Sequence, residues 1–447
     1  MKSLKLGSVA FAVMLAAVAC TPGAAPTGAA PTNGGDPTGS APTASEPGAS
    51  APTSSEPGAS EPGASEPGAS QPAGEFGTDE IAAGEPILIG TAMVITGANE
   101  ALGLDSQYGA EVALSLRPEV VGHPVEFNHQ DDGCSAEGGQ TAARALVSDP
   151  QIVAVIGTSC SSAGVPAAEI LSDEGVILIS SSNTAPSLTA PDTHQDFYLR
   201  TAHNDKIQGE AMARFACEEL EVSTAATIHD GSPYAQQLQQ VFADQFAAIC
   251  DGTITAQEAI NVGDTDFRPL LTSIAADSPE FLYYPIFVAE GGLITSQARE
   301  TAGLEDTLLA GSDGIFTPDF LDAAGGAADD MYLSGPDLEY EGGFYADEFL
   351  PAYSEISGED QPISVFHAHA FDAANMIFDA IEAVAVENAD GSLSIDRQAL
   401  RDEIFATSGY EGVTGTLTCD EFGDCADAQI SVSQVQDGEF VRIWPEE

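Results

Sequence analysis

Basic residues are scarce in this 447-residue chain, which has 12 Lys and Arg against 70 Asp and Glu and a formal net charge of −58. Its lysines are Lys2, Lys5 and Lys206. A molecule of this charge repels the phosphates of nucleic acid and other polyanions, so we expect no nucleic-acid partner. We interpret the acid excess as a solvated acidic surface, as in adaptation to high salt, in preference to an acidic binding face.

Cysteine is also infrequent, with seven residues and no C-x-x-C pair. Zinc binding and thioredoxin-like chemistry therefore have little support, and we expect no metal. The sequence also lacks a G-x-G-x-x-G motif and a P-loop lysine, so we expect no nucleotide cofactor. Six cysteines remain when Cys20 is set apart, and an even number in an exported protein suggests disulfides. These six are Cys134, Cys160, Cys217, Cys250, Cys419 and Cys425.

The N-terminal segment has the pattern of an export signal. Lys2 and Lys5 precede an apolar stretch, 6–19, that is too short for a membrane span. Residues 1–19 are therefore expected to be a signal peptide, and Cys20 the lipidated first residue of a membrane-anchored, extracytoplasmic protein. The usual lipoprotein pattern has Leu three positions before the cysteine, and Ala17 stands there instead. Ordinary cleavage with an incidental cysteine is the alternative.

Residues 20–85 are expected to be a linker. The stretch 21–75 is almost entirely Ala, Pro, Gly, Ser, Thr and Glu, and EPGAS occurs in it four times. Such a composition lacks the apolar content that would offset the entropy of ordering, so it predicts disorder.

From about residue 86 onward, short apolar segments alternate with segments whose apolar residues recur at helical spacing. This alternation predicts an α/β fold with parallel strands joined by crossover helices. A break near 201–203 separates two such blocks. The expected strands are 87–95, 125–128, 152–156, 176–179, 225–228, 281–284, 307–310 and 331–333. The expected helices are 135–148, 163–173, 205–220, 234–248, 267–276, 291–302, 342–356, 363–387 and 396–406, before a β-rich tail at 414–444.

Ligands bind at the carboxyl ends of the strands in open parallel sheets, so the loops just after the strands are the candidate site. These loops are rich in Ser, Thr, Gly and aromatic residues, and they carry two acids. They cover 96–103, 157–164, 180–187, 229–235, 285–291 and 311–316.

An enzyme is not expected. Ser159 almost fits the G-x-S-x-G pattern of a nucleophile elbow, but Ser161 stands where the last glycine belongs. Among the histidines only His229 follows a strand end in the manner of a base, and a Cys160 nucleophile is disfavoured in an oxidising compartment. His367 and His369 lie two apart in an expected helix and point to nearly opposite sides, so they predict packing or surface roles in place of a metal site.

The stretch 160–188, CSSAGVPAAEILSDEGVILISSSNTAPSL, resembles the branched-chain amino-acid-binding proteins of ABC importers, which are periplasmic binding proteins of the Leu/Ile/Val-binding type. HQDDGC at 129–134 resembles the acidic turn that precedes a cysteine in that family. IHDGSPYAQQL at 228–238 resembles its His-Asp-x-x-x-Tyr-Gly element, with Ala235 in place of Gly. The resemblance covers about 86–445.

The resemblance implies two Rossmann-like lobes with parallel sheets, joined by a three-strand hinge and closing over one ligand. Lobe 1 would comprise 86–202 and 336–412, and lobe 2 would comprise 203–335 and 413–447. It also implies an amino-acid ligand, ABC permease subunits as partners, and a monomer. A ligand-sensing receptor of the same fold, or a binding protein for an amide, urea or aromatic acid, are the alternatives.

Site residues follow from the same resemblance. Ser161 and Thr184 would hold the α-carboxylate of the ligand, and the Ser182 carbonyl and Thr184 hydroxyl would accept hydrogen bonds from its ammonium. Asp313 falls where the family has a glutamate that pairs with the ammonium. The pocket for the ligand side chain would be lined by Leu102, Tyr234 and Phe287.

The resemblance further implies a disulfide between Cys134 and Cys160 at neighbouring strand ends. Proximity along the chain suggests the other two pairs, Cys217 with Cys250 and Cys419 with Cys425.

Overall fold

The computed structural model describes residue 74 and residues 76–445. The predicted signal peptide, the lipidation of Cys20 and nearly all of the predicted linker lie outside the described residues. The linker had been expected to reach residue 85, but strand β1, Thr78–Ile81, pairs with β14, Leu393–Asp396, and Ile81 is buried. The boundary at residue 85 is therefore wrong, because a paired strand already begins at Thr78.

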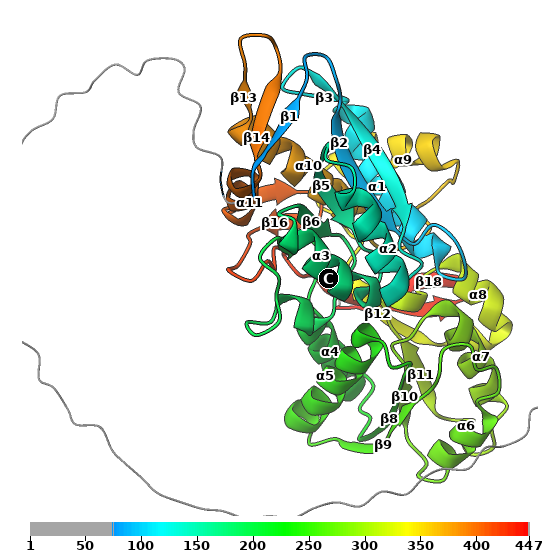
Figure 1. The fold of residues 1–447 in the computed structure, drawn as a ribbon. Helices are drawn as coiled ribbons and strands as arrows, with labels where there is room; N and C mark the ends of the chain where they lie inside the picture. The colour runs from blue at the N-terminus through cyan, green and yellow to red at the C-terminus, as the bar shows by residue number, and fades with distance from the viewer. Residues whose placement is uncertain (1–73, 75, 446–447) are drawn as a thin grey trace, which may run out of the picture. The chain divides into compact units, whose positions relative to one another are not determined.

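The first large sheet has six strands in the order β3-β4-β2-β5-β6-β7 (Figure 1). All neighbours are parallel except β3 and β4. The strands of 87–95, 125–128, 152–156 and 176–179 are confirmed to within a few residues, whereas β3 and β7 were not predicted. The bounds are β3 Glu119–Val120, β4 His123–Asp131, β2 Ile87–Met93, β5 Ile152–Gly157, β6 Ile177–Ser180 and β7 Tyr198–Arg200.

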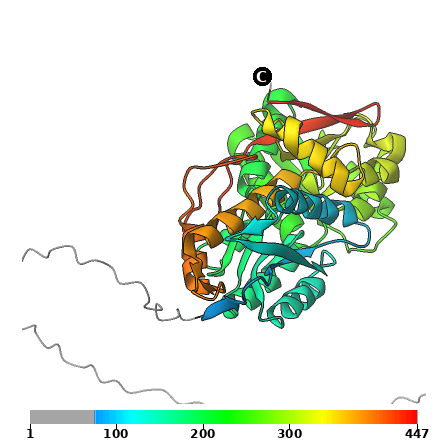
Figure 2. The same cartoon turned by 90° about the horizontal axis from the view of Figure 1, so that it is seen from above.

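Helices cover both faces of this sheet, which explains why its strands are apolar on both sides. Val155 packs with α2 and α3 on one face, and its neighbour Ile156 packs with α1 and α10 on the other. Helix α1 lies against α10 in both views (Figures 1 and 2), so closely that a Cβ on Gly109 would approach the His367 carbonyl oxygen to 1.9 Å. The helices are α1 Glu100–Leu116, α2 Ala136–Val147, α3 Ser161–Asp173, α9 Leu350–Ser357, α10 His367–Val384 and α11 Arg397–Phe405.

The second large sheet has seven strands in the order β18-β17-β12-β11-β10-β8-β9. Strand β17 runs antiparallel to both of its neighbours, β12 and β18. The strands are β8 Thr224–His229, β9 Thr253–Ala259, β10 Phe281–Tyr283, β11 Leu308–Gly311, β12 Tyr332–Pro336, β17 Ile430–Gln436 and β18 Glu439–Trp444. Its helices are α4 Asp205–Arg214, continued by the π-helical turn η2 Phe215–Glu219, then α5 Pro233–Cys250, α6 Arg268–Ala275, α7 Val288–Arg299 and α8 Pro318–Ala324.

The chain passes between the two cores three times: after β7, after β12 and before β17. Each large sheet with its helices forms one lobe, which gives the two-lobed α/β fold that the resemblance implied. Leu417 and Cys425 are buried in the core of the first sheet, although the sequence-based division assigned residues 413–447 to lobe 2. The third passage therefore comes later, at the residues just before Ile430, because the small hairpin β15–β16 (Tyr410–Gly412 and Gly415–Leu417) still packs on lobe 1.

The remaining short elements complete the description. The segment predicted as one helix at 342–356 is divided into the π-helical turn η5, Tyr345–Phe349, and α9. Other short elements are η1 Pro186–Thr189, η3 Asp313–Ile315, η4 Gly325–Ala328 and β13 Val386–Glu387. In the described part of the chain no helix is both long and apolar enough to cross a membrane.

The candidate ligand site

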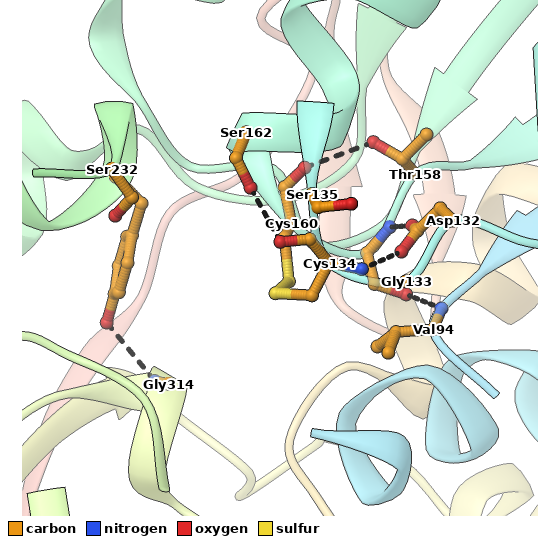
Figure 3. Close-up of a disulfide and its surroundings, with 12 residues drawn as sticks. Val94, Asp132, Gly133, Cys134, Ser135, Thr158, Cys160, Ser162, Ser232 and Gly314 are labelled. Atoms are coloured by element: carbon orange, nitrogen blue, oxygen red, sulfur yellow. Dashed lines mark hydrogen bonds between the residues drawn. A yellow bond between two sulfur atoms is a disulfide. The ribbon is translucent and has the colours of Figure 1, made fainter. Parts of the chain in front are cut away.

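Three disulfides join the described cysteines. Cys134–Cys160 is the pair that the resemblance implied, and Cys217–Cys250 and Cys419–Cys425 are the pairs that proximity along the chain suggested. The first lies at the carboxyl ends of β4 and β5 and fixes the loop that leads into α3 (Figure 3). Asp132 supports the same loop, because its carboxylate accepts hydrogen bonds from the backbone N–H groups of Cys134 and Ser159, both at 2.7 Å.

Ser159 serves this loop as a structural group. Its hydroxyl accepts a hydrogen bond from the Val94 N–H at 2.9 Å, and its carbonyl accepts one from the Ser182 hydroxyl at 2.8 Å. No histidine is among its hydrogen-bond partners in the described residues. Ser159 therefore has no base beside it, although its sequence nearly matches a nucleophile elbow.

The start of α3 presents free hydrogen-bond donors. Its N-cap is the half-cystine Cys160, which makes no side-chain cap, whereas α2 and α5 begin at serines that do. The first N–H groups of a helix have no partner within the helix and favour an anion. Ser161 is the first residue of α3, and its hydroxyl accepts from the Ala185 N–H at 3.2 Å, which leaves the hydroxyl proton to be donated.

The loop after β6 carries the next two predicted residues, Ser182 and Thr184. Both are buried. The Thr184 hydroxyl makes no well-aligned hydrogen bond to a described residue, although it lies close enough to the Asp205 carboxylate to lower the pKa of that group. A buried polar group without a partner costs about 1–3 kcal/mol. A ligand group that bonds this hydroxyl would recover that cost.

Asp205 is a site residue that the sequence reasoning missed. It begins α4, is fully buried, and neither of its carboxylate oxygens has a well-aligned hydrogen bond from a described residue, although the Thr184 hydroxyl lies nearby. Its pKa is well above the ordinary value, chiefly because of burial and then because of the nearby charge of Asp313, although Thr184 and Arg200 act to lower it. An acid at a helix start is an ordinary feature, and β7 was not predicted, so the loop after β7 was not searched.

Asp313 lies near Asp205 in the same lobe, in the turn after β11. Its Oδ1 accepts hydrogen bonds from Gln208 Nε2 at 2.7 Å and from the Tyr234 hydroxyl at 3.2 Å. Burial raises the pKa of Asp313 to about 6, against hydrogen bonds that lower it. The Tyr234 hydroxyl also lies 2.5 Å from Ser312 Oγ, so Tyr234 and Asp313 hold each other in place.

The predicted apolar lining also comes together in part. The rings of Tyr234 and Phe287 lie 5.3 Å apart between centroids. Leu102, from the start of α1 in the first lobe, is buried in the same packed cluster as Tyr234, with Phe287 packed against it. This buried cluster therefore includes side chains from both lobes.

Two hydrogen bonds also connect the lobes at the edge of the site. The Ser187 N–H donates to Gln237 Oε1 at 2.9 Å, and Gln237 Nε2 donates to Ser187 Oγ at 2.9 Å. Ser187 follows the Thr184 loop, and Gln237 lies one turn beyond Tyr234 on α5, so the contact keeps these two site elements in register.

His367 and His369 are both buried in α10. Nδ1 of His367 lies 3.1 Å from Asp105 Oδ2, and its Nε2 lies 2.7 Å from the Tyr345 hydroxyl. Burial lowers the pKa of His369 well below the ordinary value, so this side chain is neutral. His367 connects α10 to α1 through Asp105, and His369 packs against the ring of Phe366. Among the described residues no cluster of His, Cys, Asp or Glu has an arrangement suited to a metal ion.

The site thus places hydroxyl and N–H donors on lobe 1 opposite two buried carboxylates and an aromatic wall. Donors suit a carboxylate, the buried carboxylates suit a cation, and the wall suits an apolar group.

A family profile and a curated relative both match this chain to binding proteins. The profile of a family described as "Periplasmic binding protein" matches residues 86–439. A Leu/Ile/Val-binding protein homolog of Brucella melitensis is 28% identical over 369 residues, covering 81% of this chain and 95% of that protein.

Solved structures agree with this match. The leucine-binding protein LivK of Thermotoga maritima superposes with a TM-score of 0.72 at 25% identity, covering 80% of this chain and 97% of that one. LivJ of Streptococcus pneumoniae, solved with isoleucine, gives a TM-score of 0.69 at 25% identity and covers 81% and 100%. A solute-binding protein of R. palustris, solved with benzoate, shares the fold at 18% identity with a TM-score of 0.67, covering 80% and 95%.

Proposed function

Since the chain belongs to the periplasmic binding protein family, and is a solute-binding protein and not an enzyme, we propose that it captures a hydrophobic amino acid, branched-chain or similar. The ligand would bind between the lobes and be delivered to an ABC permease. We also propose that the protein acts outside the cytoplasm, as a monomer anchored by lipidated Cys20. Binding energy gained across both lobes would shift the protein toward its closed form.

The buried pair Asp205 and Asp313 is the observation that supports an amino acid. Two carboxylates in one apolar site are unfavourable unless a cation joins them, as their raised pKa values indicate. Arg200 acts on Asp205 electrostatically, but its guanidinium is hydrogen-bonded to Asp424. An α-ammonium would supply the missing charge. A benzoate-like acid carries none and would add a third anion.

A thermal-shift screen of the twenty amino acids tests this proposal. A ligand that binds only the folded protein stabilises it by RT ln(1 + [L]/Kd), about 2.7 kcal/mol at a hundredfold excess over Kd. We expect the largest shifts with leucine, isoleucine or valine and none with benzoate. A shift with benzoate and none with any amino acid would overturn the proposal.

Amino-acid affinity should fall as the pH decreases. Asp313 of the free protein has a pKa of about 6, and an ammonium bound to its ionised form would lower that pKa. Protons therefore compete with the ligand, and the affinity at pH 5 should be about tenfold weaker than at pH 7. Calorimetry between pH 5 and 8 measures this dependence.

The ligand-free protein serves as the control for that measurement. The folded pKa of Asp313 lies above its ordinary value of 3.8, so its contribution to stability is largest below 3.8 and is lost as the pH rises through about 6. Melting temperature and affinity should then respond to pH in opposite directions through this group. An affinity that is constant from pH 5 to 8 would contradict the assignment of Asp313.

A further inference from the structure

Arg200, the last residue of β7, holds the loop that carries Thr184. Its side chain is fully buried. Its Nη1 donates hydrogen bonds to the carbonyl oxygens of Asn183 and Ala185, both at 3.0 Å. These two carbonyls flank Thr184, so the position of the Thr184 hydroxyl depends on where the guanidinium is held.

Asp424 holds the guanidinium in turn. Its Oδ1 accepts from Arg200 Nε, and its Oδ2 accepts from Asn204 Nδ2 at 2.9 Å. Asn204 immediately precedes Asp205. Burial acts to raise the pKa of Asp424, but the charge of Arg200 and the hydrogen bonds from Arg200, Asn204 and Thr189 hold it below the ordinary value. One carboxylate thereby connects the loop of Thr184 with the start of the helix that carries Asp205.

The Cys419–Cys425 disulfide closes a loop around Asp424, with a sequence separation of 6. The backbone of this loop pairs with Arg200 on both sides: the Arg200 N–H donates to the Gly423 carbonyl at 2.9 Å, and the Cys425 N–H donates to the Arg200 carbonyl at 3.1 Å. A Cβ on Gly423 would lie 2.5 Å from the Tyr198 carbonyl oxygen, so the loop sits directly against β7.

We propose that Arg200 and Asp424 are positioning residues for the ligand site, and that the Cys419–Cys425 disulfide keeps their loop in the conformation that presents Thr184 and Asp205 to the ligand. We call Arg200, Asp424 and this disulfide the clamp. The inference rests on the proposed function, since the clamp orders the side chains to which we assign the α-carboxylate and the ammonium.

The clamp would strengthen binding because it reduces the conformational entropy that the Thr184 loop loses when the ligand binds. Binding is weakened when a loop must be fixed at the moment of association, and it is strengthened when the loop is fixed beforehand. The clamp spans 224 positions of sequence between Arg200 and Asp424, so nothing local holds these groups together. A short covalent loop limits the conformations that Asp424 can adopt and thus the positions of Arg200.

A pair of double variants tests the clamp: Cys419→Ala with Cys425→Ala, and as a control Cys217→Ala with Cys250→Ala. The control removes a disulfide of sequence separation 33 in the second lobe. Cys250 ends α5, whose first turn carries Tyr234, so it lies about 24 Å along the helix from the site. Because the longer loop gives the larger stabilisation, the control should lose more thermal stability than the clamp variant.

We expect the clamp variant to lose more ligand affinity than the control, although it loses less thermal stability. Calorimetry with L-leucine, L-isoleucine and L-valine on the full chain should show Kd increased at least tenfold in the clamp variant and within twofold of the wild type in the control. A Kd that is unchanged in the clamp variant, or affinity losses that follow the losses of melting temperature in both variants, would overturn the clamp.

Hydrogen exchange of the ligand-free proteins separates failure of the clamp from failure of the proposed function. If the wild type binds none of these amino acids, the proposed function fails, but the clamp still predicts faster exchange of the backbone amides of residues 182–185 in the clamp variant alone. Equal exchange in the two double variants would refute it whatever the ligand is.

Discussion

Asp313→Asn should abolish high-affinity amino-acid binding without unfolding the protein. Removing one partner of a buried, hydrogen-bonded charge pair costs about 2–5 kcal/mol, which corresponds to an increase in Kd on the order of thirtyfold to several thousandfold. The fold should survive, because the asparagine oxygen can still accept from Gln208 Nε2 and the Tyr234 hydroxyl. Isothermal titration calorimetry at pH 7.5 measures the change.

Asp322→Asn is the matched control for that variant. It removes the same charge from an exposed position in α8, so it should leave Kd within twofold of the wild type. The melting temperature of ligand-free Asp313→Asn should be no lower than that of the wild type at pH 7.5, since the ionised carboxylate is unfavourable in its buried place. Wild-type affinity in Asp313→Asn would remove Asp313 from the site.

Thr184→Val should weaken binding by about ten- to 150-fold, the effect of losing a hydrogen bond worth about 1.5–3 kcal/mol to a charged group. Valine has nearly the shape of threonine, and the hydroxyl that it removes is buried and makes no well-aligned hydrogen bond to a described residue. The ligand-free variant should therefore be as stable as the wild type or more so. Affinity by calorimetry and melting temperature by calorimetric scanning separate the two effects.

Thr227→Val provides the control for Thr184→Val. Thr227 lies in β8 and is also fully buried with an unpartnered hydroxyl, so the same substitution should have a similar effect on stability. It should leave the affinity unchanged, because Thr227 is within the strand and not in a ligand loop. Equal affinities in both variants would show that the Thr184 hydroxyl does not contact the ligand.

Much of the fold followed from local patterns. Runs of buried β-branched residues marked the main strands, because both faces of a parallel sheet are covered, as Val155 and Ile156 illustrate. The strands and helices that were missed or misjudged are short or irregular. β7 has only three residues, and the segment at 342–356 divides into η5 and α9.

The candidate site was predictable where a residue belongs to a recognisable loop. Ser161, Ser182, Thr184, Tyr234 and Asp313 stand at strand ends, and the structure places Tyr234 against Asp313 as a hydrogen-bonded pair. Asp205 was not predictable, because an acid in the first turn of a helix has the same sequence signature whether it is solvated or buried. Its environment depends on Asp313, which is distant in sequence and lies in the turn after β11.

The sequence by itself therefore determined the α/β class and the strands and helices with a clear hydrophobic period. Its resemblance to a family implied the candidate loops and the Cys134–Cys160 pair, whereas proximity along the chain only suggested the other two pairs. Only the tertiary structure decided which charges face one another: Asp205 with Asp313, and Arg200 with Asp424 across 224 positions. The physical reason is that hydrophobic periodicity is a local pattern, which several residues of each strand or helix repeat. The contact between two carboxylates has no such repeated pattern in the sequence, because it depends on how loops that are distant in sequence pack together.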